Sequence, residues 1–119
     1  MAAGKYDLYI EKGTSFERVL TLKESDNSIY DLTGFTAEMD VRETIDSETT
    51  ILSLTTEGSG AQISIDSEPG TITITIDKAV LTAITQSEGV YDLEITDDEG
   101  LTTRLIEGKV FFSDEVTRE

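Results

Sequence analysis

The chain has 119 residues, a common size for one domain, and its composition excludes most catalytic chemistry. With no histidine and no cysteine, it can build neither Ser-His nor Cys-His nucleophiles and lacks the commonest zinc ligands. Its net charge of −16 repels phosphates, so we expect neither nucleic acid nor a membrane as a partner. Hydrophobic residues make up 37%, enough for one core, and we expect a single domain over residues 1–119.

Apolar and polar residues alternate with a period of two along most of the chain, which predicts half-buried strands. Turn-forming residues separate these runs every 8–12 residues or so, as is typical of a sandwich or barrel. The predicted strands are residues 6–11, 15–22, 35–42, 51–55, 61–65, 71–76, 90–95 and 103–113. The Thr-Ile run at 71–76 would aggregate at an open edge, so we expect it to be paired on both sides. Gly108 predicts a bulge or bend in the last strand.

The segment 77–84 breaks this alternation and predicts a short helix that closes one end of the sandwich. Val80, Leu81 and Ile84 recur there at helical spacing, and Asp77 is a favourable N-cap. Tyr91 follows, either as a corner tyrosine whose hydroxyl bonds to backbone or as an ordinary core residue. These features predict an all-β fold: an immunoglobulin-like antiparallel β-sandwich of about eight strands with one short helix near residues 77–85.

Acidic residues are the only abundant catalytic type in the sequence, with 25 of them, but they form no recognisable active site. A glycosidase needs two carboxylates that face each other across a cleft. Here the carboxylates fall in predicted turns and on the polar faces of predicted strands, and a small domain has little material for a cleft. We therefore predict that the protein is not an enzyme and has no catalytic and no cofactor-binding residues.

Loop carboxylates raise the question of calcium, because oxygen ligands in loops form many Ca²⁺ sites. Asp97, Asp98 and Glu99 form one such group, and Asp26 with Asn27 forms another. Neither group has the spacing of an EF-hand loop, and Asp and Asn are ordinary turn residues. We predict no metal site and no cofactor.

Protein–protein contact is the remaining kind of function, and three tyrosines are the candidate partner contacts. Tyr6, Tyr9 and Tyr30 are the aromatics that the predicted core does not need. Tyr6 and Tyr9 lie in the first predicted strand, where an open edge could add to the sheet of a neighbour. The alternative is that these rings cover the margin of the domain's own core.

Six motifs in a fixed order carry a resemblance to a known group of proteins. They read YDLYIEKGTSF, YDLTGFTAEMDVRE, GTITITI, AVLTAI, GVYDLEI and TRLIEGKVFFSDEVTR, and they span residues 6–118. In this order the chain resembles small β-sandwich structural proteins of bacteriophage tails and baseplates. It is also similar to the N-terminal domains of baseplate upper proteins and receptor-binding proteins.

The resemblance implies a non-enzymatic virion structural protein, a tail, baseplate or fibre-attachment adaptor that acts through protein–protein contacts. It implies other virion structural proteins as partners, multiple copies in a symmetric assembly, and a location in the virion after synthesis in the host cytoplasm. Two alternatives stay open: a capsid (head) decoration protein, and a module that binds glycans on the host surface.

Overall fold

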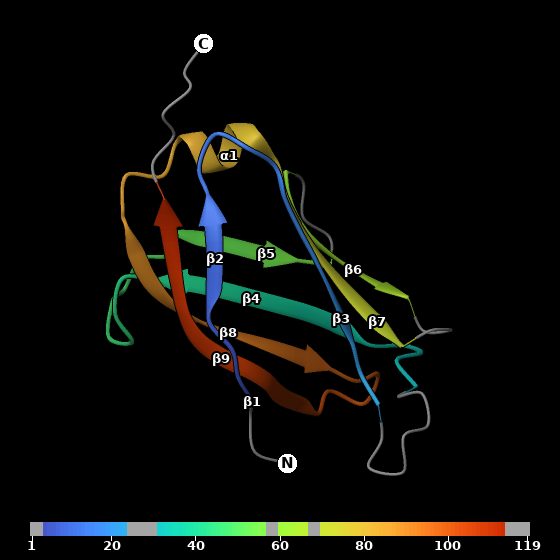
Figure 1. Cartoon of the computed structure of the whole chain (residues 1–119). Helices are drawn as coiled ribbons and strands as arrows, with labels where there is room; N and C mark the ends of the chain where they lie inside the picture. The colour runs from blue at the N-terminus through green and yellow to red at the C-terminus, as the bar shows by residue number, and fades with distance from the viewer. Residues whose placement is uncertain (1–3, 24–30, 57–59, 67–69, 114–119) are drawn as a thin grey trace.

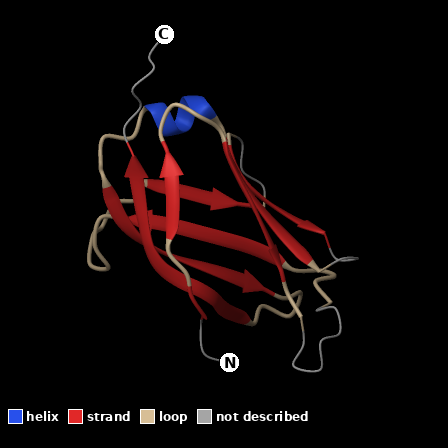
Figure 2. Cartoon of the chain, in the orientation of Figure 1, coloured by secondary structure: helices blue, strands red, loops and turns tan. Residues whose placement is uncertain are grey.

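Strands form wherever the sequence alternates, as the computed structural model of the chain shows (Figures 1 and 2). It describes residues 4–23, 31–56, 60–66 and 70–113. Every predicted strand and the predicted helix are present there. The elements are β1 (Gly4–Lys5), β2 (Leu8–Glu11), β3 (Phe16–Thr21), β4 (Thr36–Arg42), β5 (Leu52–Thr55), β6 (Ala61–Asp66), β7 (Thr71–Ile76), α1 (Lys78–Thr82), β8 (Glu88–Thr96) and β9 (Thr102–Ser113).

Backbone pairing joins the strands into one curled sheet in the order β1-β9-β8-β4-β5-β6-β7-β3, with β2 also paired to β9 (Figure 1). β5 and β6 share one residue pair, Thr55 with Gln62, so the sheet folds there into two layers. The five-stranded layer consists of β1 and β2 as one interrupted edge, followed by β9, β8, β4 and β5. The second layer consists of β6, β7 and β3.

The predicted antiparallel pairing holds for most neighbours but not at the N-terminal edge. β1 and β2 run parallel to β9, and β5 runs parallel to β6. A tight turn forces two successive strands to be antiparallel, whereas β2 and β9 are distant in sequence and no turn fixes their relative direction. The alternation pattern therefore located β2, β5 and β6 but could not give their direction, and it did not predict β1.

The inward-facing rows of the two layers form one hydrophobic core. β7 supplies Ile72, Ile74 and Ile76, all fully buried, and it lies between β3 and β6. The expectation that residues 71–76 are paired on both sides is thereby confirmed. Among the described residues no polar or charged side chain is fully buried, and Arg18 of β3, which is on the inward side of its strand, is only partly buried.

The short helix α1 closes one end of the sandwich, as the sequence predicted (Figure 1). The amides of Val80 and Leu81 donate to the Asp77 carbonyl at 3.1 and 3.2 Å and begin the helix. Leu81 and Ile84 are buried in the core. In the described parts of the chain no helix is long and apolar enough to cross a membrane.

Tyr91 and Gly108 fix the place where the chain passes from β1 to β2. The Tyr91 hydroxyl donates to the carbonyl of Tyr6, so the ring is buried and its hydroxyl bonds to backbone. The partner is the N-terminal segment rather than the crossover that precedes β8, so Tyr91 is not a corner tyrosine of the usual kind. A Cβ on Gly108 would collide with the Tyr6 carbonyl and lie 2.9 Å from Oδ1 of Asp7.

The predicted irregularity in the last strand is real, but it lies before Gly108. The register of β8 and β9 shifts between Leu93 and Glu94, opposite Ile106 and Arg104. Leu105 is the extra residue of this bulge. Gly108 is needed for the close approach of the N-terminal segment instead.

Candidate functional site

Outward side chains of β9, β8 and β4 form regular rows across the five-stranded layer. The register aligns one residue from each strand in each row. The cationic row is Lys109, Val90 and Arg42. The acidic row is Glu107, Asp92 and Asp40. The mixed row is Arg104, Glu94 and Glu38.

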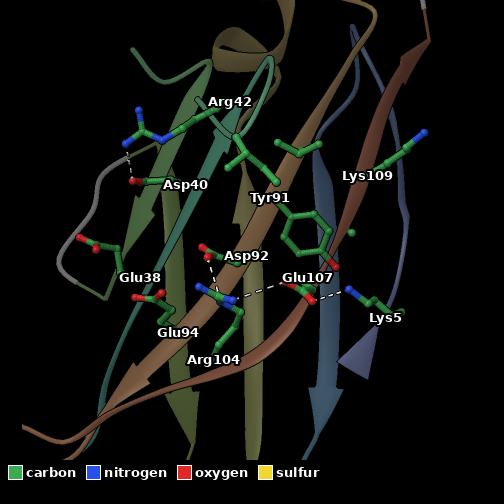
Figure 3. Close-up of a pocket in the computed structure, with 13 residues that line it drawn as sticks. Lys5, Glu38, Asp40, Arg42, Tyr91, Asp92, Glu94, Arg104, Glu107 and Lys109 are labelled. Atoms are coloured by element: carbon green, nitrogen blue, oxygen red, sulfur yellow. Dashed lines mark hydrogen bonds and ion pairs between the residues drawn. The ribbon is translucent and has the colours of Figure 1, made fainter. Parts of the chain in front are cut away.

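These rows line a shallow hollow of about 550 Å³ on the outer face of the layer (Figure 3). Side chains of β4, β8 and β9 point into it, and Lys5 of β1 lies at its margin. Ile45 and Val90 are the aliphatic residues among those that line the hollow. The arrangement is a broad, open, polar face rather than a deep cleft, which suits contact with another macromolecule better than capture of a small molecule.

Ion pairs within the chain hold the acidic row in place (Figure 3). Arg104 Nε lies 3.1 Å from Asp92 Oδ2, and its Nη1 lies 3.6 Å from Glu107 Oε1. Lys5 also bonds to Glu107, and this bond, with the charges of Lys5 and Arg104, lowers the pKa of the Glu107 carboxyl. Arg42 Nη2 lies 3.3 Å from Asp40 Oδ2. All of these pairs are at least partly exposed, so each contributes little to stability.

Like charges lie directly opposite each other at two places on this face. Asp40 pairs in register with Asp92, and Glu38 pairs with Glu94. Such cross-strand pairs destabilise a sheet. Arg42 and Arg104 compensate the first pair, but among the described residues neither Glu38 nor Glu94 has a cation within ion-pairing distance. The Lys109 ammonium likewise has no carboxylate partner among them, so the described residues leave part of the charge on this face unpaired.

Nearly balanced charge also sets this face apart from the rest of the chain. The chain has nine basic residues against 25 acidic ones. Four of the basic residues line the hollow, together with five acidic ones. The basic residues are Lys5, Arg42, Arg104 and Lys109, and the acidic residues are Glu38, Asp40, Asp92, Glu94 and Glu107.

Metal-binding geometry is absent from the part of the chain that the structure describes, where no three carboxylates converge. Asp97 instead organises its own turn, because its Oδ1 accepts the amides of Glu99 and Leu101, both at 2.9 Å. Asp26 and Asn27 lie outside the described residues. That the protein is not an enzyme stays a prediction.

The structure separates the tyrosines that were singled out as partner contacts. Tyr6 is 39% exposed, and its hydroxyl accepts a hydrogen bond from Arg18 of β3, so this ring helps to close the gap between two sheet edges. Tyr9 is 68% exposed and stacks on Phe111, with ring centroids 5.2 Å apart, on the outer face of the five-stranded layer. Tyr30 lies outside the described residues.

Sequence reasoning missed the charged rows. Their signal was present in the polar positions of the alternating strands, such as Glu38, Asp40 and Arg42. Alternation shows that these side chains point outward, but only the register between strands shows which of them share a row.

No protein-family model matches the chain, and no curated protein matches its sequence. Among solved structures it is similar to the extracellular domain of the voltage-gated sodium channel beta4 subunit, with a TM-score of 0.56 and 13% identity. The match covers 98% of this chain and 97% of that one. The chain has an immunoglobulin-like β-sandwich fold. Since 339 solved chains match and the identity is low, this likeness shows the fold and nothing more.

The virion role implied by the resemblance to phage proteins is wrong. The fold that matches along the whole chain is that of an extracellular domain whose parallel homodimers explain a role in cell–cell adhesion, not that of a phage structural protein. The prediction of a tail, baseplate or fibre adaptor is therefore withdrawn, together with head decoration and glycan binding. The six motifs that carry the resemblance consist of turn and strand residues that unrelated sandwiches share, so they do not specify a function.

Proposed function

We propose that this domain is a non-enzymatic protein-binding module that associates with a second copy of itself. The observation that carries the proposal is the balanced charge of the outer face of the five-stranded layer. Two chains that each carry a net charge of −16 repel one another over most of their surfaces. A face with four basic and five acidic residues is the part of the described surface where two copies can approach with favourable contacts.

The fold likeness supports self-association without transferring it. The sodium channel beta4 extracellular domain forms parallel homodimers, which explain its role in cell–cell adhesion. Because the match covers nearly all of both chains, the same layers and faces are available in this protein. The absence of histidine and cysteine from the sequence supports a binding role over a catalytic one.

Sedimentation velocity of the purified domain tests the proposal. A weak, reversible association has a dissociation constant of about 1 µM to 1 mM, that is, about −8 to −4 kcal/mol, so the measurement should span that range at about 150 mM salt. We expect the average mass to rise from one chain towards two as concentration increases. A domain that stays monomeric throughout would contradict the proposed function.

A further inference from the structure

The sign of the charge alternates along the strands of the five-stranded layer. The cationic row lies next to the acidic row, because successive outward residues on β9 are Lys109 and Glu107 and on β4 are Arg42 and Asp40. Outward residues two positions apart are about 6.6 Å apart along a strand. A second copy rotated by half a turn can therefore bring opposite charges together, or like charges, depending on the direction of the rotation axis.

Two symmetric face-to-face arrangements are available, and the register distinguishes them. An axis along the strands would place Lys109 opposite Arg42 of the second copy, and Glu107 opposite its Asp40, so both central contacts would join like charges. That arrangement offers one favourable contact, Arg104 with Glu38.

An axis across the strands, between the cationic and acidic rows, keeps each strand opposite its own counterpart. Lys109 then faces Glu107 of the second copy, and Arg42 faces its Asp40, each contact occurring twice by symmetry. Farther from the axis, the Phe111 ring of one copy faces the Arg104 guanidinium of the second copy, which is a cation–π contact. Glu88 of one copy faces Glu94 of the second copy, and this is the one like-charge contact that the register gives this arrangement.

We infer that two copies associate through the outer face of the five-stranded layer. A two-fold axis that runs across the strands relates the copies, so that the cationic row of each copy lies against the acidic row of the other. This rests on the proposed self-association. The beta4 homodimers are parallel, but at 13% identity their orientation does not transfer to this chain.

The face offers a small area for contact between two copies. Five strands about 4.8 Å apart cover a width of roughly 20 Å, which places the contact near the lower end of specific interfaces. The hollow of about 550 Å³ leaves room for bridging water between the charged rows.

Charge reversal on β9 tests both the face and the axis. In a dimer of Lys109→Glu, two glutamates face each other at both of the symmetry-related contacts between positions 109 and 107. In a dimer of Glu107→Lys, two lysines face each other at the same contacts. We therefore expect each variant to dimerise at least about tenfold more weakly than the wild type. An equimolar mixture of the two variants restores both contacts in a heterodimer. We expect its dissociation constant, measured by sedimentation with one variant fluorescently labelled, to return to within about threefold of the wild type.

Matched controls change the net charge equally on the second layer. The control substitutions are Lys23→Glu and Glu17→Lys. Lys23 follows β3, Glu17 lies on β3, and both residues are exposed. We expect these controls to leave the dissociation constant within about twofold, provided that thermal melts show all variants folded. If Glu107→Lys does not fold, Arg42→Glu and Asp40→Lys repeat the exchange on β4.

The outcomes separate the two proposals. Tighter dimers from either single reversal would show the axis along the strands and overturn the inference. Dimers of unchanged strength would place the contact on another face, which overturns the inference and leaves the proposed function standing. A wild type that is monomeric at every concentration would overturn both.

Discussion

At the scale of single residues, Tyr91 connects the N-terminal segment to the body of the domain. Its hydroxyl donates to the Tyr6 carbonyl, and its ring is buried in the core. Burial, with smaller effects from Tyr6 and Asp7, raises the pKa of the Tyr91 hydroxyl above its ordinary value. One side chain thus supplies both a packing contact and a hydrogen bond between segments far apart in the sequence.

Tyr91→Phe keeps the ring and removes only the hydroxyl. We expect it to lower the free energy of unfolding by about 1–2 kcal/mol, because the Tyr6 carbonyl loses its donor. Urea unfolding followed by fluorescence or circular dichroism measures this change. Tyr9→Phe is the matched control, since the Tyr9 hydroxyl is exposed and its loss should cost less than about 0.5 kcal/mol. Equal stability of Tyr91→Phe and the wild type would show that the bond contributes nothing.

Tyr91 also makes the domain sensitive to alkaline conditions. A folded-state pKa above the unfolded value of about 10 means that folding favours the neutral phenol. This stability is fully present below pH 10 or so and is lost as the pH rises towards the folded-state pKa. We expect the wild type to lose stability more steeply than Tyr91→Phe above pH 10 in unfolding curves measured at several pH values. Parallel curves for the two proteins would contradict this assignment.

At the scale of elements, the interrupted edge strand depends on close contact with β9. The amide of Tyr6 donates to the Glu107 carbonyl at 3.0 Å, and Asp7 Oδ1 accepts the amide of Lys109 at 2.9 Å. Gly108 lies between these two bonds and permits the approach. On the facing edge, Arg18 of β3 occupies an inward position, with its guanidinium 5.8 Å from the Tyr6 ring centroid. An inward charge of this kind discourages pairing with foreign strands at an edge.

Gly108→Ala tests the attachment of the N-terminal edge. The added Cβ would meet the backbone of Tyr6, which has no flexible end to yield, so we expect a loss of about 1–3 kcal/mol in the free energy of unfolding. Hydrogen exchange should speed up most at the amides of Tyr6 and Lys109. Gly4→Ala is the control, because its Cβ would meet Ile106 Cγ2 at an ordinary 3.5 Å. Equal effects of the two substitutions would show that close approach is not the cause.

At the scale of the whole molecule, charge is distributed unevenly. The chain as a whole is strongly acidic, whereas the outer face of the five-stranded layer combines both signs in nearly equal number. Two electrostatic effects therefore oppose each other on dimerisation: repulsion between two acidic chains, and attraction between the rows. Repulsion acts over the Debye length, about 30 Å at 0.01 M salt and about 8 Å at 0.15 M, whereas the row contacts act at a few ångströms.

We expect self-association to pass through a maximum as salt increases. At about 0.01 M the chains repel, near 0.15 M that repulsion is screened while the row contacts persist, and near 1 M the row contacts are screened as well. Sedimentation equilibrium at the three salt concentrations measures this dependence. Association that keeps strengthening up to 1 M would indicate an apolar interface instead of the charged rows.

The elements of this fold were accessible from the sequence, while their arrangement was not. Alternating residues such as those from Phe35 to Arg42 located every strand except the two-residue β1, and Leu81 with Ile84 located the helix. The parallel pairing of β1 and β2 with β9 and the partner of Tyr91 escaped prediction, since Tyr6 and Tyr91 lie 85 residues apart. The candidate site was missed for the same reason: tyrosines stand out in a sequence, whereas a row of charges exists only once three strands are aligned.

The sequence by itself indicated which residues face inward in the strands that alternate, because period-two alternation is a local property of a strand. It did not do so in β3, where Arg18 is on the inward face and Val19 is 52% exposed. It also determined the absence of histidine and cysteine and the strong negative charge. Only the tertiary structure decided that Lys109 shares a row with Arg42, and Glu107 with Asp40. Strand register depends on contacts between segments far apart in the chain, and a shift of one residue would turn every outward charge towards the core.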